Sequence, residues 1–505
     1  MKKFFLFALI TVALASCCQN NDIVYQTHVI PEPNNMEVVA GRYTYDETPK
    51  VSYEQDKNLG EEEYKLEVTK KGVTITYATD VAKMYAEATL SQLQDNDGVT
   101  NYMPLVKIDD KPRFKHRGFM LDEARHFQGM EFVKKTLDRM AFHKLNKFHW
   151  HLSDDQGWRI EIKKYPLLTE KGSIRKGTQV GWKPDIMDCP TDGVEYGKGY
   201  YYTQEQIKEV IEYAAKLGID VIPEIDMPGH MMAALHAYPE LGPKRSYEVR
   251  QYWGVSHDVL DVSNPKTLQF AKDVISEVCD LFPYHLIHIG GDECPKEQWE
   301  KSASCQKMIK DLGLKNEEEL QSWFLKEIEK TVNAKGKQIA GWDEILDGDM
   351  SKTATVYHWR FWTKENMTKV AAERGNEVVS TLNHRMYFDF YVSYDKEHFE
   401  PLAFPYATPL HKTYNYDPIP ADLDPKYHDK VIGVQGNLWT EYVTSNETAE
   451  MRIFPRFALL SEVAWTNQDL RDWENMNRKL PYIFKVYDSW KLNYNRVYIA
   501  TDCEY

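Results

Sequence analysis

The chain has 505 residues, enough for a large barrel plus an accessory unit, and a formal net charge of −15. This acidic balance, with no run rich in Lys and Arg, argues against a nucleic-acid partner. Neither of the common glycine-rich phosphate loops occurs, so the sequence gives no support for a nucleotide site.

The first residues predict an export signal. Two lysines precede an apolar run over residues 4–13, and Leu-Ala-Ser-Cys follows at 14–17. A membrane-spanning helix needs about 20 apolar residues, and this run is too short. The four letters resemble a bacterial lipobox, which would make Cys17 the lipidated first residue of the mature chain. We expect an exported protein anchored by lipid at the outer membrane or in the periplasm, with membrane contact only through that anchor; a plain secretory signal is the alternative.

The next segment predicts a small α/β unit. "YKLEVTKKGVTITYA" alternates apolar and polar residues on both sides of Lys70-Lys71-Gly72, which is typical of a hairpin. "DVAKMYAEATLSQLQ" then has apolar residues at helical spacing. No set of catalytic residue types occurs in this unit.

From Arg113 onward, predicted strands alternate with predicted helices. Thr203 and Gln206 form a possible capping box, and Asn264-Pro265 begins another helix. Eight such repeats favour a (β/α)8 TIM barrel over a doubly wound sheet. The expected strands lie within residues 117–127, 146–155, 219–230, 285–293, 338–344, 353–359, 377–383 and 431–439. The expected divisions are a signal peptide with lipobox (1–17), a small α/β domain (22–110), the catalytic barrel (111–490) and a C-terminal tail (491–505).

Acidic residues follow five of the expected strands. The carboxyl ends of barrel strands meet at one rim, where the active site of this fold lies. The sequence therefore predicts a rim rich in carboxylates. The acids are Asp122, Asp154-Asp155, Asp226, Asp292-Glu293 and Asp343-Glu344.

The segment "HIGGDE" places Asp292 and Glu293 next to each other after two glycines. Retaining glycosidases usually hold two carboxyls about 5–5.5 Å apart across the sugar. Neighbouring residues more naturally approach from one side, so Glu293 suits a general acid better than Asp292 suits a nucleophile. The simplest remaining nucleophile is a 2-acetamido group of the substrate itself, and the adjacent acid would orient the N–H of that group. Adjacency hints at this substrate assistance; the alternative is one capping acid and one solvated acid.

Six motifs in order carry a resemblance to a known family. They are "RGFMLDEARHF", "FHWHLSDDQGWRIEI", "IPEIDMPGH", "HIGGDE", "GWDE" and "LWTE". Over residues 113–465 the chain resembles glycoside hydrolase family 20, the β-N-acetylhexosaminidases. The resemblance implies exo-acting, retaining, substrate-assisted hydrolysis of terminal β-linked GlcNAc or GalNAc from glycans.

The resemblance also implies roles for individual residues. Glu293 matches the general acid/base, Asp292 the residue that polarises the acetamido nitrogen, and Tyr387 the hydroxyl that binds the acetamido carbonyl. Trp342, Trp359 and Trp439 match the aromatic walls around the N-acetyl methyl. The remaining matches are a polar clamp on the sugar hydroxyls (Arg125, Asp389 and Glu441) and a relay behind Glu293 (Asp154 and His230).

Three alternatives stay open. A metal-dependent barrel hydrolase could use His149, His151, Asp154 and His230, but no further histidine cluster is recognised at a suitable strand end, and we expect no metal or cofactor. A sugar-binding lipoprotein would keep the tryptophans without needing Glu293. A lacto-N-biosidase would release a disaccharide by the same chemistry. The loop at 183–203 is expected to lie over the rim.

Overall fold

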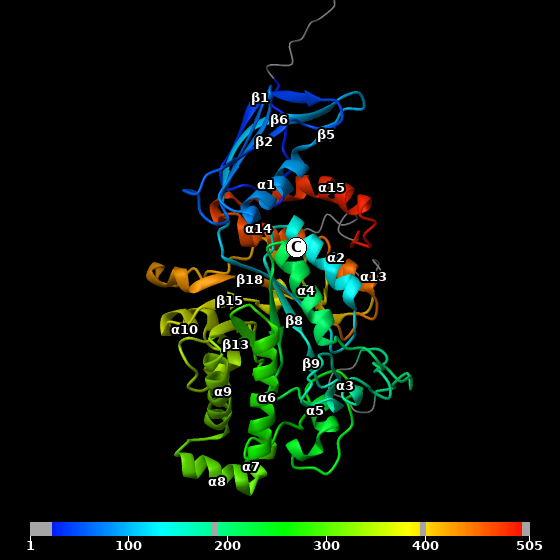
Figure 1. Ribbon diagram of the computed structural model, residues 1–505, viewed down its shortest axis with the longest axis vertical. Helices are drawn as coiled ribbons and strands as arrows, with labels where there is room; N and C mark the ends of the chain where they lie inside the picture. The colour runs from blue at the N-terminus through cyan, green and yellow to red at the C-terminus, as the bar shows by residue number, and fades with distance from the viewer. Residues whose placement is uncertain (1–22, 183–188, 394–399, 497–505) are drawn as a thin grey trace, which may run out of the picture.

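The computed structural model describes residues 23–182, 189–393 and 400–496, and its centre is a closed barrel (Figure 1). The strands follow one another around the barrel in chain order, and the last closes onto the first in parallel, with Gly433 opposite His116. This confirms the predicted (β/α)8 fold. The barrel strands are β7 (His116–Asp122), β8 (Lys147–His151), β11 (Asp220–Glu224), β12 (Leu286–His288), β13 (Gln338–Trp342), β14 (Thr355–His358), β15 (Val378–Ser380) and β18 (Val431–Leu438).

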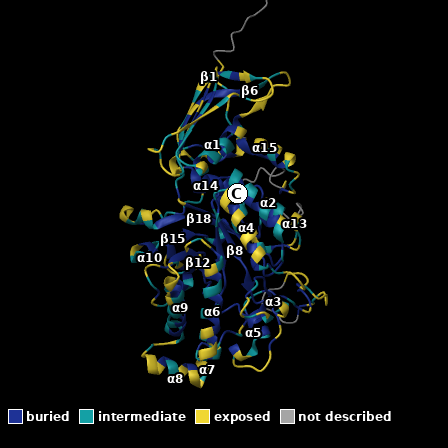
Figure 2. Ribbon diagram, in the orientation of Figure 1, coloured by how far each residue is buried: buried dark blue, intermediate teal, exposed yellow. Residues whose placement is uncertain are grey.

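Helices surround the barrel, with their exposed faces outward and the strands buried inside (Figure 2). The predicted capping box is present: the Thr203 hydroxyl accepts from the Gln206 amide, and the Gln206 side chain accepts from the Thr203 amide. No helix in the described ranges is long and apolar enough to cross a membrane. The main outer helices are α2 (Met130–Phe142), α4 (Gln204–Lys216), α6 (Pro265–Leu281), α9 (Glu317–Ala334), α10 (Met367–Arg374), α12 (Leu410–Tyr414), α14 (Arg456–Trp465) and α15 (Trp473–Ser489).

Irregular excursions interrupt the repeat and supply much of the surface around the barrel's carboxyl end. Between β13 and β14 the chain makes only a 3-10 turn, η2 (Asp343–Leu346), in place of a full helix. The other short elements are β9 (Ser153–Asp154), β10 (Gly157–Trp158), α3 (Leu167–Glu170), α5 (Met232–Ala237), η1 (Pro239–Leu241), α7 (Glu297–Lys301), α8 (Ala303–Leu312), α11 (Asn383–Met386), β16 (Phe390–Tyr391), β17 (Phe404–Ala407), η3 (Pro425–Lys430), α13 (Asn446–Ile453) and η4 (Gln468–Leu470).

A separate sheet precedes the barrel and is covered on one side by a helix (Figure 1). The predicted hairpin forms between β3 and β4, and Gly72 takes a φ of 143° at its turn, which glycine adopts without a steric cost. Thr79 caps the predicted helix by accepting a hydrogen bond from the Ala82 amide. The elements are β1 (Met36–Tyr45), β2 (Val51–Gln55), β3 (Tyr64–Thr69), β4 (Gly72–Tyr77), α1 (Asp80–Leu93), β5 (Asp95–Asn96) and β6 (Asn101–Asp110).

Buried polar contacts join this sheet domain to the barrel. The Asp110 carboxylate accepts hydrogen bonds from the Trp465 indole at 3.0 Å and lies 3.3 Å from the Lys144 ammonium. Arg117, at the start of β7, pairs with Glu62 at 2.6 Å. Because buried charges are costly unless they are paired, these contacts favour one fixed arrangement of the two units.

Candidate active site

A cavity of about 550 Å³ lies at the carboxyl end of the barrel. The side chains that line it come from the ends of several strands and from the loops that follow them, as expected for this fold. Of the eleven residues predicted for the site, Asp154 alone does not line the cavity; it is buried behind His230. The structure brings together the other ten, which line the cavity: Arg125, His230, Asp292, Glu293, Trp342, Trp359, Tyr387, Asp389, Trp439 and Glu441.

A tight turn after β12 lets two neighbouring acids face the same cavity. Gly290, Gly291 and Glu293 have φ values of 64°, 96° and 44°, all in the left-handed region. The turn ends the strand alternation that would send adjacent side chains to opposite faces. Asp292 is only 7 % exposed, whereas the side chain of Glu293 is 39 % exposed at the edge of the cavity.

The conformation and contacts of Gly290 give a testable result for this turn. A Cβ at Gly290 would lie 1.7 Å from Asp226 Oδ1, whereas a Cβ at Gly313, with a similar φ of 69°, would meet nothing within 4 Å. We expect Gly313→Ala to cost about 1 kcal/mol of backbone strain, and Gly290→Ala to cost at least about 2 kcal/mol more because Asp226 must move. Urea unfolding of the two variants measures the difference. Equal losses would contradict the tight contact with Asp226.

His230 connects both acids to a buried partner. Its Nε2 lies 3.5 Å from Glu293 Oε2 and 3.8 Å from Asp292 Oδ2. Its Nδ1 lies 3.1 Å from Asp154 Oδ1, and Arg125 Nη2 lies 2.8 Å from Asp154 Oδ2. Burial would raise the pKa of Asp154, but Arg125 and His230 hold it well below its ordinary value. Burial opposes the charge of His230, but Asp154 raises the pKa of His230 well above normal, so a cation faces the two acids.

Asp292 is a buried carboxyl that faces the cavity. Burial, reinforced by Asp226, raises the pKa of its carboxyl well above the ordinary value, while His230 acts in the opposite direction. Its Oδ1 is buried and has no hydrogen-bond partner among the described residues. Buried polar atoms are normally paired, so this atom indicates a ligand with a donor group.

Aromatic rings form one side of the cavity. The ring centroid of Trp439 lies 5.8 Å from that of Trp342 and 6.2 Å from that of Tyr387. Trp359 stacks on Tyr387 with an interplanar angle of 11° and a centroid distance of 6.3 Å. The indole N–H groups of Trp342 and Trp359 donate hydrogen bonds to residues that do not line the cavity. Trp342 donates to Glu224 at 2.8 Å, and Trp359 donates to Glu344 at 2.9 Å. Their carbon faces are thereby left for a small apolar group.

Arg125, Asp389 and Glu441 form a polar group in the same cavity. Arg125 Nη1 lies 3.9 Å from Glu441 Oε1, and its guanidinium stacks over Trp439 at 5.0 Å. Neither oxygen of Asp389 has a partner among the described residues, and the same is true of Glu441 Oε2. Burial, reinforced by Glu441, raises the pKa of Asp389 well above normal, and burial raises that of Glu441 to about 7. These acceptors fit the hydroxyl groups of a sugar.

The rim acids divide into two groups. Asp122 accepts hydrogen bonds from the Ala124 and Arg125 amides and pairs with the Arg125 side chain at 3.2 Å. Asp343 pairs with Arg360 at 2.7 Å. The strand-end acids gather at the rim, as predicted. Asp292 and Glu293 line the cavity, whereas Asp122 and Asp343 do not line it and instead pair with arginine side chains.

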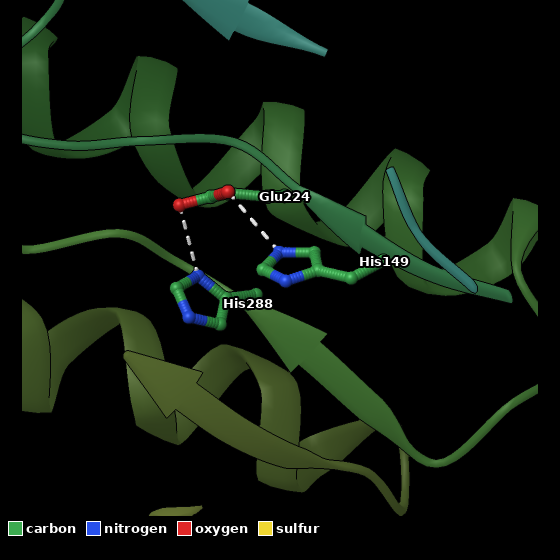
Figure 3. Close-up of side chains that lie close together, drawn as sticks. All are labelled: His149, Glu224 and His288. Carbon is green, nitrogen blue, oxygen red and sulfur yellow. Dashed lines mark ion pairs between the residues drawn. The ribbon is translucent and has the colours of Figure 1, made fainter. Parts of the chain in front are cut away.

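A buried cluster of histidines in the barrel interior differs from the expectation that no further histidine lies near His149. His288 lies beside His149, with ring centroids 4.5 Å apart, and both surround Glu224 in the interior of the barrel (Figure 3). We recognised no such third histidine in the sequence, although His149, Glu224 and His288 each occupy an inward-facing position of a barrel strand. The Glu224 carboxylate already has nitrogen atoms around it, which makes this cluster a poor fit for a cation.

Several cavity residues were not predicted. Most of them lie on loops without a periodic pattern, and Phe404 and Tyr406 lie on the four-residue strand β17, so no sequence signal identified them. Trp182 also lines the cavity, directly before the loop expected over the rim, but residues 183–188 of that loop lie outside the described residues. The unpredicted aromatic residues at the mouth are Trp253, Phe361, Trp362, Phe404, Tyr406 and Tyr442.

A barrel cavity with adjacent carboxylates, an aromatic wall and unpaired acceptors for hydroxyl groups defines a glycoside hydrolase type of site. Sequence comparison agrees with that class. The model of the glycosyl hydrolase family 20 catalytic domain matches residues 114–468, and the model of domain 2 of that family matches residues 35–111. The chain belongs to glycosyl hydrolase family 20.

Individual relatives show how far the similarity extends. A beta-hexosaminidase of Porphyromonas gingivalis is 41 % identical over 446 residues, covering 86 % of this chain and 55 % of that protein. One from Akkermansia muciniphila is 32 % identical over 458 residues, covering 90 % and 89 %. The chain spans 55 % and 65 % of the lengths of its relatives from P. gingivalis and Vibrio furnissii. The crystal structure of a Vibrio harveyi family 20 exo β-N-acetylglucosaminidase with N-acetylglucosamine superimposes with a TM-score of 0.82 at 32 % identity, covering 94 % of this chain and 80 % of that chain.

Proposed function

We propose that the chain removes terminal, non-reducing β-linked N-acetylhexosamine from glycans by retaining, substrate-assisted hydrolysis. One observation carries this proposal: Asp292 and Glu293 lie within 3.8 Å and 3.5 Å of the same nitrogen of His230. They therefore approach a bound sugar from one side. A pair of carboxyls that works through a covalent glycosyl-enzyme flanks the sugar instead.

The geometry supports a role for each group in the first step. Glu293, at the exposed edge, donates a proton to the glycosidic oxygen as the bond to the leaving group breaks. The acetamido carbonyl oxygen of the substrate attacks the anomeric carbon and forms an oxazolinium ion. Asp292 accepts a hydrogen bond from the acetamido N–H and stabilises the positive charge, while the Tyr387 hydroxyl donates to the carbonyl oxygen. The wall of Trp342, Trp359 and Trp439 surrounds the acetamido methyl.

In the second step Glu293 takes a proton from water, which attacks the anomeric carbon and opens the ring of the intermediate. Two displacements at the same carbon retain the β configuration. Arg125, Asp389 and Glu441 bind the sugar hydroxyls throughout, and Asp154 holds His230 in position beside Glu293. No step in this scheme requires a metal or an organic cofactor.

A substrate series tests the proposal. The wild-type protein is assayed with p-nitrophenyl β-GlcNAc, β-GalNAc and the matching β-glucoside, which lacks the acetamido group. We expect cleavage of the first, and glucoside turnover lower by at least about 10³-fold because the nucleophile is missing. NMR of the freshly released sugar is expected to show the β-anomer, because the proposed reaction retains the configuration. Comparable glucoside turnover, or release of a disaccharide from lacto-N-tetraose, whose terminal sugar is galactose, would contradict the proposal.

The unpaired carboxyl of Asp389 predicts discrimination against charged sugars. An anionic group on the terminal sugar would approach a buried acid with no cation bonded to it, so we expect 6-sulfated p-nitrophenyl β-GlcNAc to be cleaved at least about 100-fold more slowly than the neutral compound. Asp389→Asn narrows that ratio, because it removes the repulsion while lowering both rates. Equal rates on the two compounds with the wild-type protein would rule out this role.

We also propose that the protein is exported and anchored through a diacylglyceryl group on Cys17, in the outer membrane or at its periplasmic face. The support is the sequence at 14–17; Cys17 itself lies outside the described residues. In a bacterial host we expect the wild-type protein to incorporate labelled palmitate and partition into Triton X-114, and Cys17→Ser to do neither. Cys18→Ser is the matched control. Unlabelled wild-type protein recovered from the medium would favour a plain secretory signal.

A further inference from the structure

A carboxylate with four nitrogen atoms around it lies in the barrel interior, behind the cavity residue Trp342; two of its partners, His149 and His288, are drawn in Figure 3. Glu224 Oε1 lies 2.8 Å from Trp342 Nε1 and 3.0 Å from His288 Nδ1. Its Oε2 lies 2.6 Å from His151 Nδ1 and 3.1 Å from His149 Nε2. The contacts with Trp342 and His151 have hydrogen-bond geometry, and those with His149 and His288 are close ion-pair contacts. None of these five side chains is more than 1 % exposed.

One partner of Glu224 belongs to the aromatic wall. Trp342 lines the cavity, and its indole nitrogen is bonded to Glu224 and not to a ligand. The hydrogen bond restricts the orientation of the indole ring, and therefore the surface that the wall presents to the cavity. Removing the acceptor would leave a buried donor unpaired, which favours another orientation of the ring.

A second partner leads to the two adjacent acids. His151 Nε2 lies 3.0 Å from Asp154 Oδ2, and the other oxygen of Asp154 lies 3.1 Å from His230, which faces Glu293 at 3.5 Å. Burial would raise the pKa of Glu224, but His151, His288 and His149 hold it well below its ordinary value. Burial opposes the charge of His151, but Glu224 raises its pKa well above normal. Negative and positive groups thus alternate from Glu224 to His230.

We propose that Glu224 is a positioning residue for both halves of the reaction: it orients the Trp342 wall that holds the acetamido group, and through His151 and Asp154 it holds His230 in place beside Glu293. This inference rests on the proposed hydrolysis. Glu224 does not touch the substrate, since the aromatic wall lies between them. The alternative use of the same atoms is a metal site, in which a cation would have to displace nitrogen donors from an already surrounded carboxylate.

The test compares Glu224→Gln with Glu329→Gln, a matched control. Glu329 is also buried, at 7 % exposure, but it lies on α9 and accepts a hydrogen bond from Thr353 outside the barrel. We expect kcat/KM to fall about 10- to 100-fold in Glu224→Gln, the size expected for loss of hydrogen bonds to a charged group. Three readouts separate positioning from a general loss of structure: the pH profile, the dependence of rate on leaving-group acidity, and the Ki of a thiazoline analogue of the oxazolinium ion.

In Glu224→Gln we expect the pH profile of kcat to shift and the thiazoline to bind at least about tenfold more weakly. We also expect the rate to fall more with alkyl leaving groups than with 2,4-dinitrophenyl. Glu329→Gln changes none of these. A folded Glu224→Gln with wild-type values for all three readouts would overturn the inference. If that variant does not fold, Glu224→Asp, which keeps the charge and retracts it by one methylene, is measured in the same way. A metal bound stoichiometrically to the wild type and lost in Glu224→Gln would also overturn it.

Failure of this inference is distinct from failure of the proposed function. If the wild type does not cleave p-nitrophenyl β-GlcNAc, the proposed function is wrong and the role of Glu224 falls with it. If the wild type is active and Glu224→Gln behaves like Glu329→Gln, only the positioning role is wrong.

A second cavity carries an independent inference about the leaving group. It has a volume of about 230 Å³ and shares Phe361 and His384 with the active-site cavity, so the two adjoin at the mouth. Arg385 and Lys412 also line it, and no acidic side chain does. Arg385 donates to the backbone carbonyl of His384 at 3.0 Å, and neither cation has an ion-pair partner among the described residues. Burial, and then Arg385 and Lys412, lower the pKa of His384, which shows how close these groups are.

Cations without an ion-pair partner among the described residues are unusual in a chain with a net charge of −15. In the proposed reaction the terminal sugar fills the closed end of the active-site cavity, so only the leaving group reaches Phe361 and His384. We infer that this second cavity binds an anionic substituent, a sulfate ester or a sugar carboxylate, on the leaving-group part of the glycan. The inference rests on the proposed function, and it gives the two ends of the site opposite charge preferences.

Matched oligosaccharides test it. The neutral substrate is GlcNAc β-linked to galactose. It is compared with the disaccharide whose galactose carries a 6-sulfate and with the disaccharide in which a uronic acid replaces galactose. The measured quantity is the ratio of kcat/KM for the charged substrate to kcat/KM for the neutral one. We expect a ratio above about 5 for the wild type, decreasing to about 1 in the double variant Arg385→Gln/Lys412→Gln and with 0.5 M NaCl. Lys307→Gln, an exposed lysine on α8, keeps the wild-type ratio. A ratio near 1 for both anions in an active wild type would overturn the inference, and a response to one anion alone identifies the ligand.

Discussion

We expect Glu293→Gln to lower kcat/KM about 10²- to 10⁴-fold on glycans and alkyl glycosides, the range typical for loss of a general acid. Glutamine keeps the shape of the side chain but cannot donate the proton that the glycosidic oxygen needs. Leaving groups that depart without a proton depend less on this residue. The loss on 2,4-dinitrophenyl β-GlcNAc is therefore expected to be smaller by at least about tenfold.

The comparison with a neighbouring acid makes this prediction specific. Glu297→Gln, on the exposed surface of α7 four residues further along the chain, removes a carboxylate of the same kind without facing the cavity, and its rates are expected to match the wild type. Steady-state kinetics over a series of aryl leaving groups measures both variants. A Glu293→Gln protein with a near-normal rate on an alkyl glycoside would assign the acid role elsewhere.

Asp292→Asn is expected to lower kcat about 10²- to 10³-fold with every leaving group, the size seen when one charge-stabilising group is removed. The acetamido N–H loses a carboxylate acceptor, and the oxazolinium ion loses the negative charge next to it. Since this group acts on the nucleophile and not on the leaving group, the dependence on leaving-group acidity stays close to that of the wild type. This distinguishes it from Glu293→Gln.

Binding of a thiazoline analogue provides the second measurement for Asp292. Because the analogue resembles the cyclised intermediate, its Ki is expected to rise at least about 100-fold in Asp292→Asn. Asp311→Asn, on the exposed helix α8, serves as the control. If Asp292→Asn bound the analogue as tightly as the wild type, the acetamido group would not contact this residue and substrate assistance would lose its main support.

The barrel could be predicted because its strands are short apolar segments that end in acids or amides. "HLIHIGGDE" and "QIAGWDE" are examples: β12 and β13 form within them, and both segments deliver side chains to the cavity. Helix signals were equally direct. The capping box at Thr203 and the proline at 265 each marked the start of a helix.

The limits of prediction also have physical causes. Tyr387 and Asp389 follow the four-residue helix α11, which has no periodic signal, so only the family motif indicated them. The aromatic rim at Phe361 and Tyr406 comes from an irregular loop and from the four-residue strand β17, and the positions of both depend on tertiary packing. The surroundings of Glu224 could not be predicted because they require the relative registers of four strands, β8, β11, β12 and β13, and alternation along one strand does not reveal those registers.

In the proposed hydrolysis, the order in which the products depart follows from the closed bottom of the active-site cavity, where Glu224 and its nitrogen partners fill the barrel interior. The released monosaccharide lies deeper than the leaving group and has no other exit. The shortened glycan therefore leaves first and the free sugar last, so each cut requires a fresh encounter with the chain end. Such an enzyme trims distributively: it shortens many glycans by one residue each before it shortens any of them completely, and free N-acetylhexosamine competes with the next chain end for the empty enzyme.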